Sequence, residues 1–361
     1  MENIHHPFFL NMKKLLPIFL VLLFLLTACA PKEKQVLTIF AAGSLMQPFQ
    51  QLEEAFEAEN PDVDVQMEFH GSIQVMRRVT DLHRELDLVA TADQSLLPML
   101  MYATNNPETG EPYANWYLSM ATNTITIAYT EKSKYADEVS AHNWFEILSR
   151  DDVRVGISDP RFDAMGYRTF MAFALATDFY SDSSIFGNFV HGQFKYPIRL
   201  KTEGENISII IPEIVETRED SHLVVRGSSI ALNSLLESGE IDYAFEYVSV
   251  ANQLGFETVK LPPEFGLNDP KLEEYYNRVT VELDFQRFAS VEPIFTAEQI
   301  RYGLTIPTNA PQPELAIRFI EFLYGPKGQQ IMKDNWQPLF IPAQVNQPEN
   351  LPAELKEFFG L

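Results

Sequence analysis

Residues 36–45 read VLTIFAAGSL, and residues 63–73 read VDVQMEFHGSI. Each begins with the apolar and β-branched residues typical of a buried strand, then passes through Gly-Ser into a segment with helical spacing. Strand, helix and strand follow one another with short connections. This order predicts a parallel sheet that is covered by helices on both faces.

The two Gly-Ser pairs mark a candidate binding edge. Glycine allows a tight turn, and a serine at a helix start adds a hydroxyl beside unpaired backbone N–H groups. One such pair alone would be a plain helix cap. Two pairs at the carboxyl ends of adjacent parallel strands indicate more, because ligands of open α/β sheets bind at that edge and helix N-termini favour anions. We therefore predict an anion site that includes Gly43, Ser44 and Ser72.

The alternation of strands and helices resumes further along the chain. Strands are expected at 123–130 and 153–158 and a helix at 166–180, whereas 181–221 is polar and irregular. A C-terminal helical pair, 311–335, completes the first unit. We expect an α/β fold with two lobes, each a mostly parallel sheet flanked by helices, with a ligand in the cleft between them.

The domain boundaries follow from two expected crossings between the lobes, near 121–124 and near 250–258. The expected segments are 1–28 as a signal peptide, 29–35 as a linker, 36–121 with 252–361 as lobe 1, and 122–251 as lobe 2.

The N-terminus predicts export. Met12-Lys13-Lys14 precedes the apolar run LLPIFLVLLFLL (15–26), which has the length of a signal-peptide core and is too short for a bilayer span. Cys29, the only cysteine, follows Leu-Thr-Ala as in a bacterial lipoprotein cleavage box, so a chance cysteine is the weaker interpretation. We expect an extracytoplasmic protein with acyl chains on Cys29, no disulfide, and Met12 as the true start.

The charge balance excludes several classes of partner. With 50 acidic and 27 basic residues, the chain carries a formal charge of −23, which repels nucleic acid and anionic lipid headgroups.

The seven histidines show no H-x-x-H or HExxH spacing, so no zinc site is expected. No G-x-S-x-G elbow is present. We expect a monomer that binds no nucleic acid.

A third stretch, DPRFDAMGYRT (159–169), connects an expected strand to an expected helix. Asp163 stands immediately before that helix, where a carboxylate commonly caps the first turn. It could also touch a ligand in the cleft. The residues alone leave both interpretations open.

Several segments together resemble a known family. FAAGSL, FHGSIQVMRRVTDL, SDPRFDAMGYR and LESGEIDYAFEYVSVA are similar to the tungstate/molybdate-binding proteins of ABC importers, in the branch first recognised in archaea. The resemblance implies a type II periplasmic-binding-protein-like fold that closes on a tetrahedral oxyanion. It also implies a permease and its ATPase as partners, no cofactor beside the ligand, and no enzymatic activity.

The resemblance assigns site residues one by one. Ser44 and Ser72 match two donors from the first lobe, and Tyr247 matches a tyrosine whose phenol points into the cleft. Asp163, Ala164 and Met165 match an Asp-Pro-Cys segment whose backbone donates to the anion and whose aspartate approaches the metal centre. Contact between Asp163 and the tungsten or molybdenum atom is therefore an expectation of the resemblance.

Two departures from the family pattern alter this expectation. Ala164-Met165 replaces Pro-Cys, so the preset φ of proline is lost. Ser229 stands where the family has a glutamate as its second carboxylate. Because serine can donate to an oxo group and cannot be an anionic ligand, we predict a plain tetrahedral anion held by hydrogen bonds.

Alternatives remain open at this point. The same fold could bind phosphate, sulfate or a ferric ion, or Asp163 and Glu246 could form the acid/base pair of a surface hydrolase. Strand alternation turns Glu246 away from Tyr247, which favours a buried structural acid. We expect Arg77 and Arg78 to be solvated or paired and His70 to be packed, whereas Arg168 stands closer to the cleft.

Overall fold

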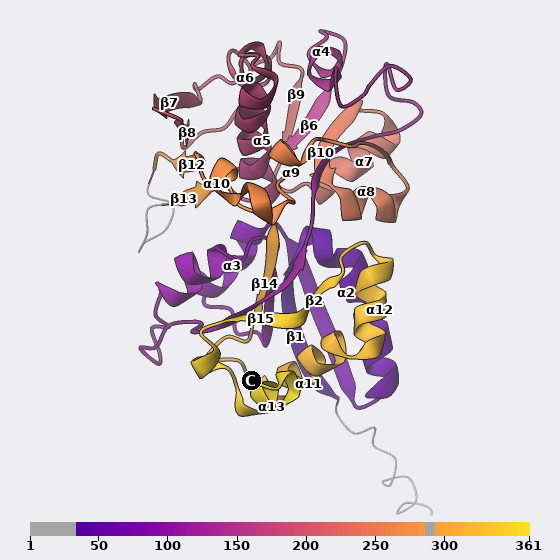
Figure 1. Ribbon diagram of the computed structural model, residues 1–361. Coiled ribbons are helices and arrows are strands. Elements are labelled where there is room, and N and C mark those ends of the chain that lie inside the picture. Colours follow the sequence, from indigo (N-terminus) through magenta and orange to yellow (C-terminus); the bar gives the residue numbers. More distant parts are fainter. Residues whose placement is uncertain (1–33, 286–292) are drawn as a thin grey trace, which may run out of the picture.

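The protein has two lobes joined by two crossings of the chain (Figure 1). The computed structural model describes residues 34–285 and 293–361. Cys29 and the predicted signal peptide lie outside the described residues, as does most of the predicted linker. Within the described part, no helix is long and apolar enough to cross a membrane.

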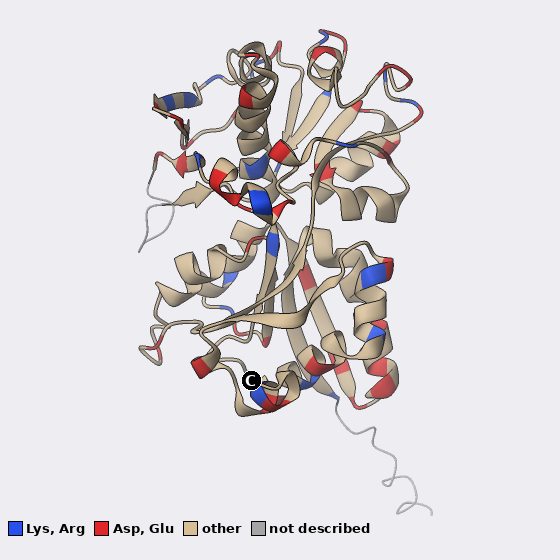
Figure 2. Ribbon diagram, in the orientation of Figure 1, with Lys and Arg blue, Asp and Glu red and all other residues tan. Residues whose placement is uncertain are grey.

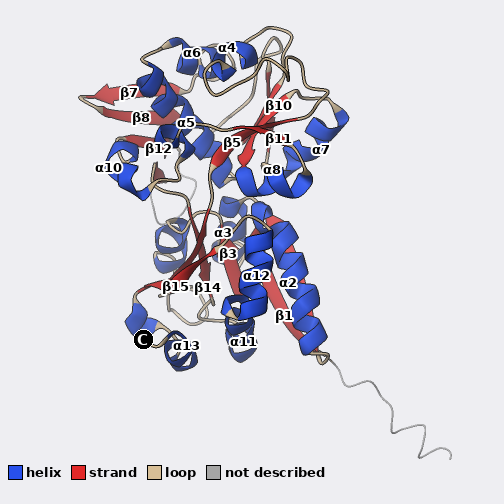
Figure 3. Ribbon diagram, turned by 45° about the vertical axis from the view of Figure 1, so that its right-hand side comes forward, coloured by secondary structure: helices blue, strands red, loops and turns tan. Residues whose placement is uncertain are grey.

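The first lobe is built on a six-stranded sheet with the order β15-β4-β14-β3-β1-β2. Helices cover it on both sides, and α2 and α12 lie together along one side (Figure 3). The predicted helical pair is confirmed as α11 and α12, which divide at Gly325. The elements of this lobe are β1 (Gln35–Ala42), η3 (Gly43–Leu45), α2 (Met46–Glu59), β2 (Val63–His70), α3 (Ser72–Thr80), β3 (Leu88–Thr91), η4 (Leu97–Tyr102), β4 (Tyr117–Thr122), β14 (Arg301–Thr305), α11 (Pro313–Tyr324), α12 (Pro326–Asp334), β15 (Leu339–Asn346), η6 (Pro348–Asn350) and α13 (Ala353–Phe359).

The second lobe is built on a five-stranded sheet with the order β11-β5-β10-β6-β9. Its elements are β5 (Ile125–Tyr129), α4 (Trp144–Leu148), β6 (Val155–Ser158), α5 (Ala164–Tyr180), α6 (Ser184–Val190), β9 (Leu223–Arg226), α7 (Ile230–Ser238), β10 (Tyr243–Tyr247), α8 (Val248–Leu254), β11 (Glu257–Val259), α9 (Pro263–Gly266), η5 (Pro270–Leu272) and α10 (Glu273–Tyr276).

A four-stranded sheet, β13-β12-β8-β7, extends the second lobe. Its strands are β7 (Arg199–Glu203), β8 (Asn206–Ile211), β12 (Val279–Leu283) and β13 (Ile294–Thr296). The segment 181–221 is therefore not irregular, as predicted, because it contains α6 and the β7–β8 hairpin. The prediction failed because β7 is exposed along its length and lacks the apolar alternation of a half-buried strand.

The predicted second boundary, at 251/252, is wrong. β11 pairs with β5, and β12 pairs in parallel with β8, so the chain stays in the second lobe well beyond residue 252. It returns at 297–300, just before β14. The first crossing, Asn123-Thr124 between β4 and β5, agrees with the prediction. The two crossings touch, since Thr122 Oγ1 donates to the Ile300 carbonyl at 2.8 Å.

Both main sheets are mixed, whereas the sequence predicted mostly parallel ones. β1 is parallel to β2 and β3, but β14 and β15 return antiparallel beside β4. In the second lobe β6 is parallel to β9 and β10, and β5 is antiparallel to β10 and β11. Of the strands that run against their neighbours, β5 and β14 directly follow the two crossings, and β15 forms an edge of the first sheet. The parallel strands keep their carboxyl ends at the lobe junction.

Helix α5 is the centre of the second lobe. Every residue from Ala164 to Ala176 is buried, because AMGYRTFMAFALA presents mostly small or apolar side chains all round the helix, with Arg168 as the one charged exception. Trp144 packs beside this helix, with its ring centroid 6.5 Å from that of Phe173 in α5, 5.6 Å from Phe189 in α6 and 5.9 Å from Phe245 in β10. This aromatic cluster fixes α5 against the sheet.

Replacing Trp144 by alanine should lower the free energy of unfolding by about 3–5 kcal/mol, because it opens a large cavity in the aromatic cluster. Chemical denaturation measures the change. The matched control is Trp336→Ala, whose indole is 51% exposed and which should change stability by no more than about 0.5 kcal/mol. Equal effects of the two substitutions would contradict a core role for Trp144.

Candidate functional site

The two lobes meet at the start of α3. The backbone N–H groups of Ile73 and Gln74 donate to the Phe162 carbonyl of the other lobe, at 3.2 and 3.4 Å. A Cβ on Gly71 would stand 2.5 Å from that carbonyl oxygen. Only glycine therefore allows this approach, and the lobes are closed on each other.

Gly43 and Ser44 lie at the same junction. A Cβ on Gly43 would stand 2.9 Å from the Ile230 side chain of α7, so this glycine also faces the second lobe. The buried Ser44 hydroxyl lies 2.8 Å from the hydroxyl of Tyr302, on β14. Tyr302 in turn accepts from Asn123 Nδ2 at 3.1 Å.

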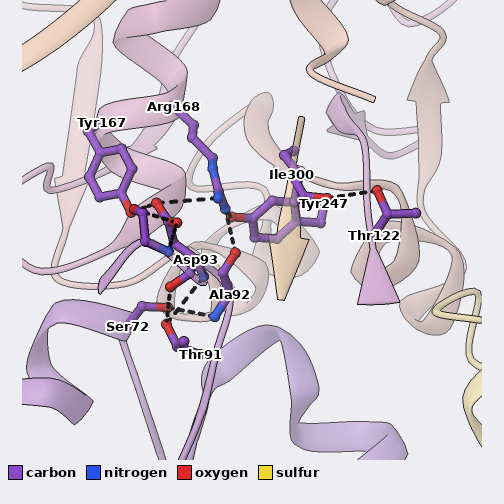
Figure 4. Close-up of polar contacts among 10 residues, drawn as sticks. Ser72, Thr91, Ala92, Asp93, Thr122, Tyr167, Arg168, Tyr247 and Ile300 are labelled. Atoms are coloured by element: carbon purple, nitrogen blue, oxygen red, sulfur yellow. Dashed lines mark hydrogen bonds and ion pairs between the residues drawn. The ribbon is translucent and has the colours of Figure 1, made fainter. Parts of the chain in front are cut away.

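Ser72 opens α3 and is fully buried. Its Oγ accepts the backbone N–H of Ala92 at 3.0 Å, as Figure 4 shows. The hydroxyl hydrogen has no acceptor within the described residues. Ser72 is therefore a donor that is held in place by the end of the neighbouring strand β3.

Asp163 occupies the N-cap position of α5, but its side chain makes no hydrogen bond to the first turn of that helix. Its Oδ2 accepts the backbone N–H of Ser229 at 2.7 Å, which ties the start of α5 to the start of α7. The buried Ala164 and Met165 follow, and their backbone N–H groups open the helix without intrahelical partners. The plain cap interpretation of Asp163 is therefore incomplete.

Burial raises the pKa of the Asp163 carboxyl above its ordinary value. The nearby N–H groups of Ser229, Met165 and Ala164 and the charge of Arg168 act in the opposite direction and are outweighed. A neighbouring dianion would raise this pKa further, since like charges oppose ionisation.

Tyr247 ends β10 and is buried at the lobe junction, where Figure 4 shows it beside Arg168. The Tyr247 hydroxyl accepts from Arg168 Nη1 at 2.8 Å. The ring lies near that of Tyr302, with centroids 6.0 Å apart. The structure therefore brings Tyr247 and Ser44 into one neighbourhood through Tyr302.

Arg168 is the residue that the sequence left undecided. It is only 2% exposed, and its Nη1 also donates to the Ala92 carbonyl of the first lobe at 2.7 Å. Its Nη2 lies 3.4 Å from Asp93 Oδ2, the atom that accepts the Tyr167 hydroxyl at 2.5 Å. Its position in a helix that is apolar all round was the available signal, because a charge there must be paired.

Glu246 faces the side of β10 opposite to Tyr247, as strand alternation predicted, and is fully buried. Its Oε1 accepts the Tyr247 backbone N–H at 2.8 Å, and its Oε2 has no hydrogen-bond partner within the described residues. Burial raises the pKa of Glu246 to about 8, and the charge of Asp163 adds to that shift. The nearby Tyr247 N–H and the side chains of Ser229 and Asn233 lower the pKa in part.

The basic residues of α3 are paired, as expected. Arg77 contacts Asp81 at 2.6 Å, and Arg78 contacts Glu68 at 3.0 Å. His70 was expected to be packed, but it lines a cavity of about 350 Å³ with these arginines and Phe162. Among residues 34–285 and 293–361, no three His, Cys, Asp or Glu side chains are grouped so that they could hold a metal ion.

The site is thus a buried junction of donors from both lobes. Ser44 and Ser72 come from the first lobe, and Tyr247 and the helix start at Ala164-Met165 come from the second. The structure places Ser229 beside Asp163 at the start of α7. The predicted residues lie together, and the supporting Tyr302, Asn123 and Arg168 were not predicted as members of the site.

Comparison with known proteins gives a consistent family. A family described as "Bacterial extracellular solute-binding protein" matches residues 37–335. The chain is 38% identical over 332 residues to the "Molybdate/tungstate-binding protein WtpA" of Thermococcus kodakarensis, covering 90% of this chain and 87% of that protein. It is 39% identical to the WtpA of Pyrococcus abyssi, covering 89% and 90%. An uncharacterized solute-binding protein of Staphylothermus marinus is 36% identical, covering 89% and 88%.

Solved structures share the fold. The periplasmic molybdate-binding protein of Azotobacter vinelandii superposes with a TM-score of 0.52 at 13% identity, covering 84% of this chain and 99% of that one. The sulfate-binding protein SubI of Mycobacterium tuberculosis gives a TM-score of 0.55 at 13% identity, covering 85% and 88%. The predicted two-lobed periplasmic-binding-protein-like fold is confirmed.

Substituting Gly71 by alanine should oppose lobe closure, because the new Cβ would stand 2.5 Å from the Phe162 carbonyl oxygen. Overpacking of this kind costs about 1–3 kcal/mol, here only in the closed state. Small-angle scattering should show a larger radius of gyration for the variant. Gly187→Ala is the control, since nothing lies within 4 Å of its added Cβ. An unchanged radius for Gly71→Ala would contradict this view of the junction.

Glu246 should make stability fall as pH rises. With a folded-state pKa of about 8 against an ordinary 4.5, the folded state holds an extra proton between these values. Stability is therefore lost through this range, by at most about 1.4 kcal/mol per pH unit. Glu246→Gln should gain stability relative to the wild type between about pH 5.5 and 8.5, measured by urea denaturation. The exposed control Glu237→Gln should show no such trend, and a parallel pH profile for the two variants would refute the assignment.

Proposed function

The chain belongs to the bacterial extracellular solute-binding protein family, and on that premise we propose that it captures tungstate or molybdate outside the cytoplasm and delivers the anion to an ABC permease. The relatives named for molybdate and tungstate binding span nearly the whole chain at 38% and 39% identity, which supports this ligand class. The permease and its ATPase are the partners that such a role requires.

One observation carries the proposal. Hydroxyl donors from both lobes, Ser44, Ser72 and Tyr247, are buried at one junction beside the helix start at Ala164-Met165. A tetrahedral oxyanion without protons offers only acceptors, so it matches such a set of donors from every side. Lobe closure removes water from around the anion and strengthens each of these hydrogen bonds.

The acidic surface does not oppose this role. Asp and Glu residues lie over both lobes (Figure 2), and the whole chain carries −23. Salt screens charges that lie more than about 8–10 Å away, whereas the N–H groups and hydroxyls act at contact distance. The local field of the site therefore outweighs the distant surface charge.

We further propose that the anion is held as a plain tetrahedron. Ser229 supplies no carboxylate, and the Asp163 Oδ2 is already engaged by the Ser229 N–H, which supports hydrogen bonding over expansion of the metal coordination. In this role the protein is a receptor that has no catalytic activity and needs no cofactor in addition to its ligand. It is a monomer, anchored to the membrane through acyl chains on Cys29.

Another oxyanion is the second candidate. Because burial raises the pKa of the Asp163 carboxyl, this group could share a proton with a phosphate, and the Ser229 departure is compatible with phosphate or sulfate. A surface hydrolase built on Asp163 and Glu246 is a weaker candidate, since the two relatives that are named for a function, and that match about 90% of this chain, are binding proteins.

Titration calorimetry of the chain cut after Cys29, with tungstate, molybdate, sulfate and phosphate at one ionic strength, tests the proposal. We expect tight binding of tungstate or molybdate and far weaker binding of sulfate and phosphate. Binding heat with phosphate or sulfate, and none with tungstate or molybdate, would contradict the proposal and support the second candidate function.

X-ray absorption at the tungsten edge tests the geometry of the bound anion. We expect the short, uniform metal–oxygen distances of a tetrahedral tungstate, because the site provides hydrogen bonds in place of a second carboxylate. Six oxygens around the metal would contradict this expectation while leaving the ligand class intact.

A further inference from the structure

We propose that Arg168 and Asn123 are positioning residues that lock the hydroxyls of Tyr247 and Ser44 as donors, so that the closed site selects oxyanions that carry no proton. This inference rests on the proposed function, because it concerns which oxyanions the same site accepts. It assigns a role to two buried side chains that lie behind the residues matched to the family site.

The Tyr247 hydroxyl is the first locked donor. A guanidinium can only donate, so the 2.8 Å contact from Arg168 Nη1 makes the Tyr247 oxygen an acceptor. The phenolic hydrogen then has to point elsewhere, and within the described residues it meets no acceptor. It is therefore available to a ligand in the junction.

Arg168 is itself held in a fixed place. Its Nη1 also donates to the Ala92 carbonyl at 2.7 Å, and its Nη2 lies 3.4 Å from Asp93. Both partners belong to the first lobe, whereas Arg168 and Tyr247 belong to the second. The lock on Tyr247 is thus complete only when the lobes are closed.

The Ser44 hydroxyl is locked through a longer relay. Asn123 Oδ1 accepts the backbone N–H of Thr124 at 2.9 Å and that of Ser249 at 3.4 Å, which fixes the orientation of the amide. Its Nδ2 then donates one hydrogen to the Ser249 hydroxyl at 2.7 Å and the other to the Tyr302 hydroxyl at 3.1 Å. Either hydroxyl of the 2.8 Å contact between Tyr302 and Ser44 could be the donor. Because Ser44 is the one acceptor that the Tyr302 hydrogen meets within the described residues, we infer that Tyr302 donates to Ser44, which leaves the Ser44 hydrogen for the ligand.

The Ser72 hydroxyl is also held as a donor, in this case by a backbone N–H. Its Oγ accepts the Ala92 N–H at 3.0 Å, and its own hydrogen has no acceptor within the described ranges. The hydroxyl oxygens of Tyr247, Ser44 and Ser72 thus each accept a hydrogen bond from the protein. Their own hydrogens remain available to donate to a ligand in the junction. The carboxyl group among these residues is that of Asp163; its Oδ2 accepts the Ser229 N–H, and the N–H groups of Met165 and Ala164 also lie near it, so a protonated anion would have to compete with these donors.

The selectivity test uses selenate and arsenate in weakly alkaline buffer. There both are tetrahedral dianions of similar size, but arsenate carries one proton and selenate carries none. We expect the wild type to bind selenate at least about tenfold more tightly, the cost of about one misdirected hydrogen bond. Equal affinities, with tungstate still bound tightly, would overturn the inference and leave the proposed function standing. Absence of binding for tungstate and molybdate would overturn both.

A double-mutant cycle tests the role of Arg168. Arg168→Met should lower tungstate affinity by about tenfold or more and reduce the preference for selenate over arsenate. In a Tyr247→Phe background the same substitution should cost much less, because the hydroxyl that it positions is gone. Arg150→Met, at a partly exposed arginine that is paired with Glu138, is the control. Additive losses with unchanged selectivity would show that Arg168 only supports the fold.

The relay to Ser44 is tested by Asn123→Asp. The aspartate keeps the shape but cannot donate to Tyr302, so Tyr302 turns its hydrogen toward residue 123 and then accepts from Ser44. The loss of tungstate affinity should be several-fold larger in the wild type than in a Ser44→Ala background. The new negative charge acts in both backgrounds and cancels in the cycle. Equal losses would overturn the relay, with circular dichroism confirming that all variants are folded.

Discussion

The side chains of Ser44, Ser72, Asp163, Arg168 and Tyr247 are buried at the lobe junction, where an unpaired donor or acceptor costs about 1–3 kcal/mol. The Phe162 carbonyl illustrates the constraint: it accepts N–H groups from the first turn of α3 in the other lobe. Closure therefore joins two helix starts that would otherwise be open to water. The bare Cα of Gly71 makes the approach possible, and the remaining donors of the junction are left facing one another.

The same constraint explains the acids of the site. Asp163 and Glu246 are buried near each other, and burial raises the pKa of both carboxyls. An anion receptor with two ionised acids at its centre would repel its own ligand. A raised pKa removes part of that repulsion, and Arg168 supplies a fixed positive charge that lowers the pKa of Asp163 in compensation. The charge of the site is thus set by burial and pairing, and the charge of the surface has little influence on it.

The path of the chain between the lobes brings the supporting residues to the junction. Asn123 lies on the first crossing and Tyr302 on β14, directly after the second, so the relay to Ser44 runs through the region that connects the lobes. Ala92 and Asp93 follow β3 of the first lobe and meet Arg168 of the second (Figure 4). The first crossing therefore contributes a hydrogen-bonding side chain, Asn123, to the candidate site.

The sequence by itself determined the local features of the fold, which depend on residues close to one another along the chain. The strands β1 and β2 with the helices that follow them, the Gly-Ser turns, the break at Gly325 and the opposite faces of Glu246 and Tyr247 follow from local periodicity and glycine geometry. The grouping of Ser44, Ser72, Asp163 and Tyr247 came from family resemblance. Only the tertiary structure decided the mixed sheets, the second crossing at 297–300 and the contacts of Arg168, Asn123 and Tyr302. These depend on contacts such as that between Asn123 and Tyr302, which are 179 residues apart, and no local pattern specifies which distant side chain will share a hydrogen bond.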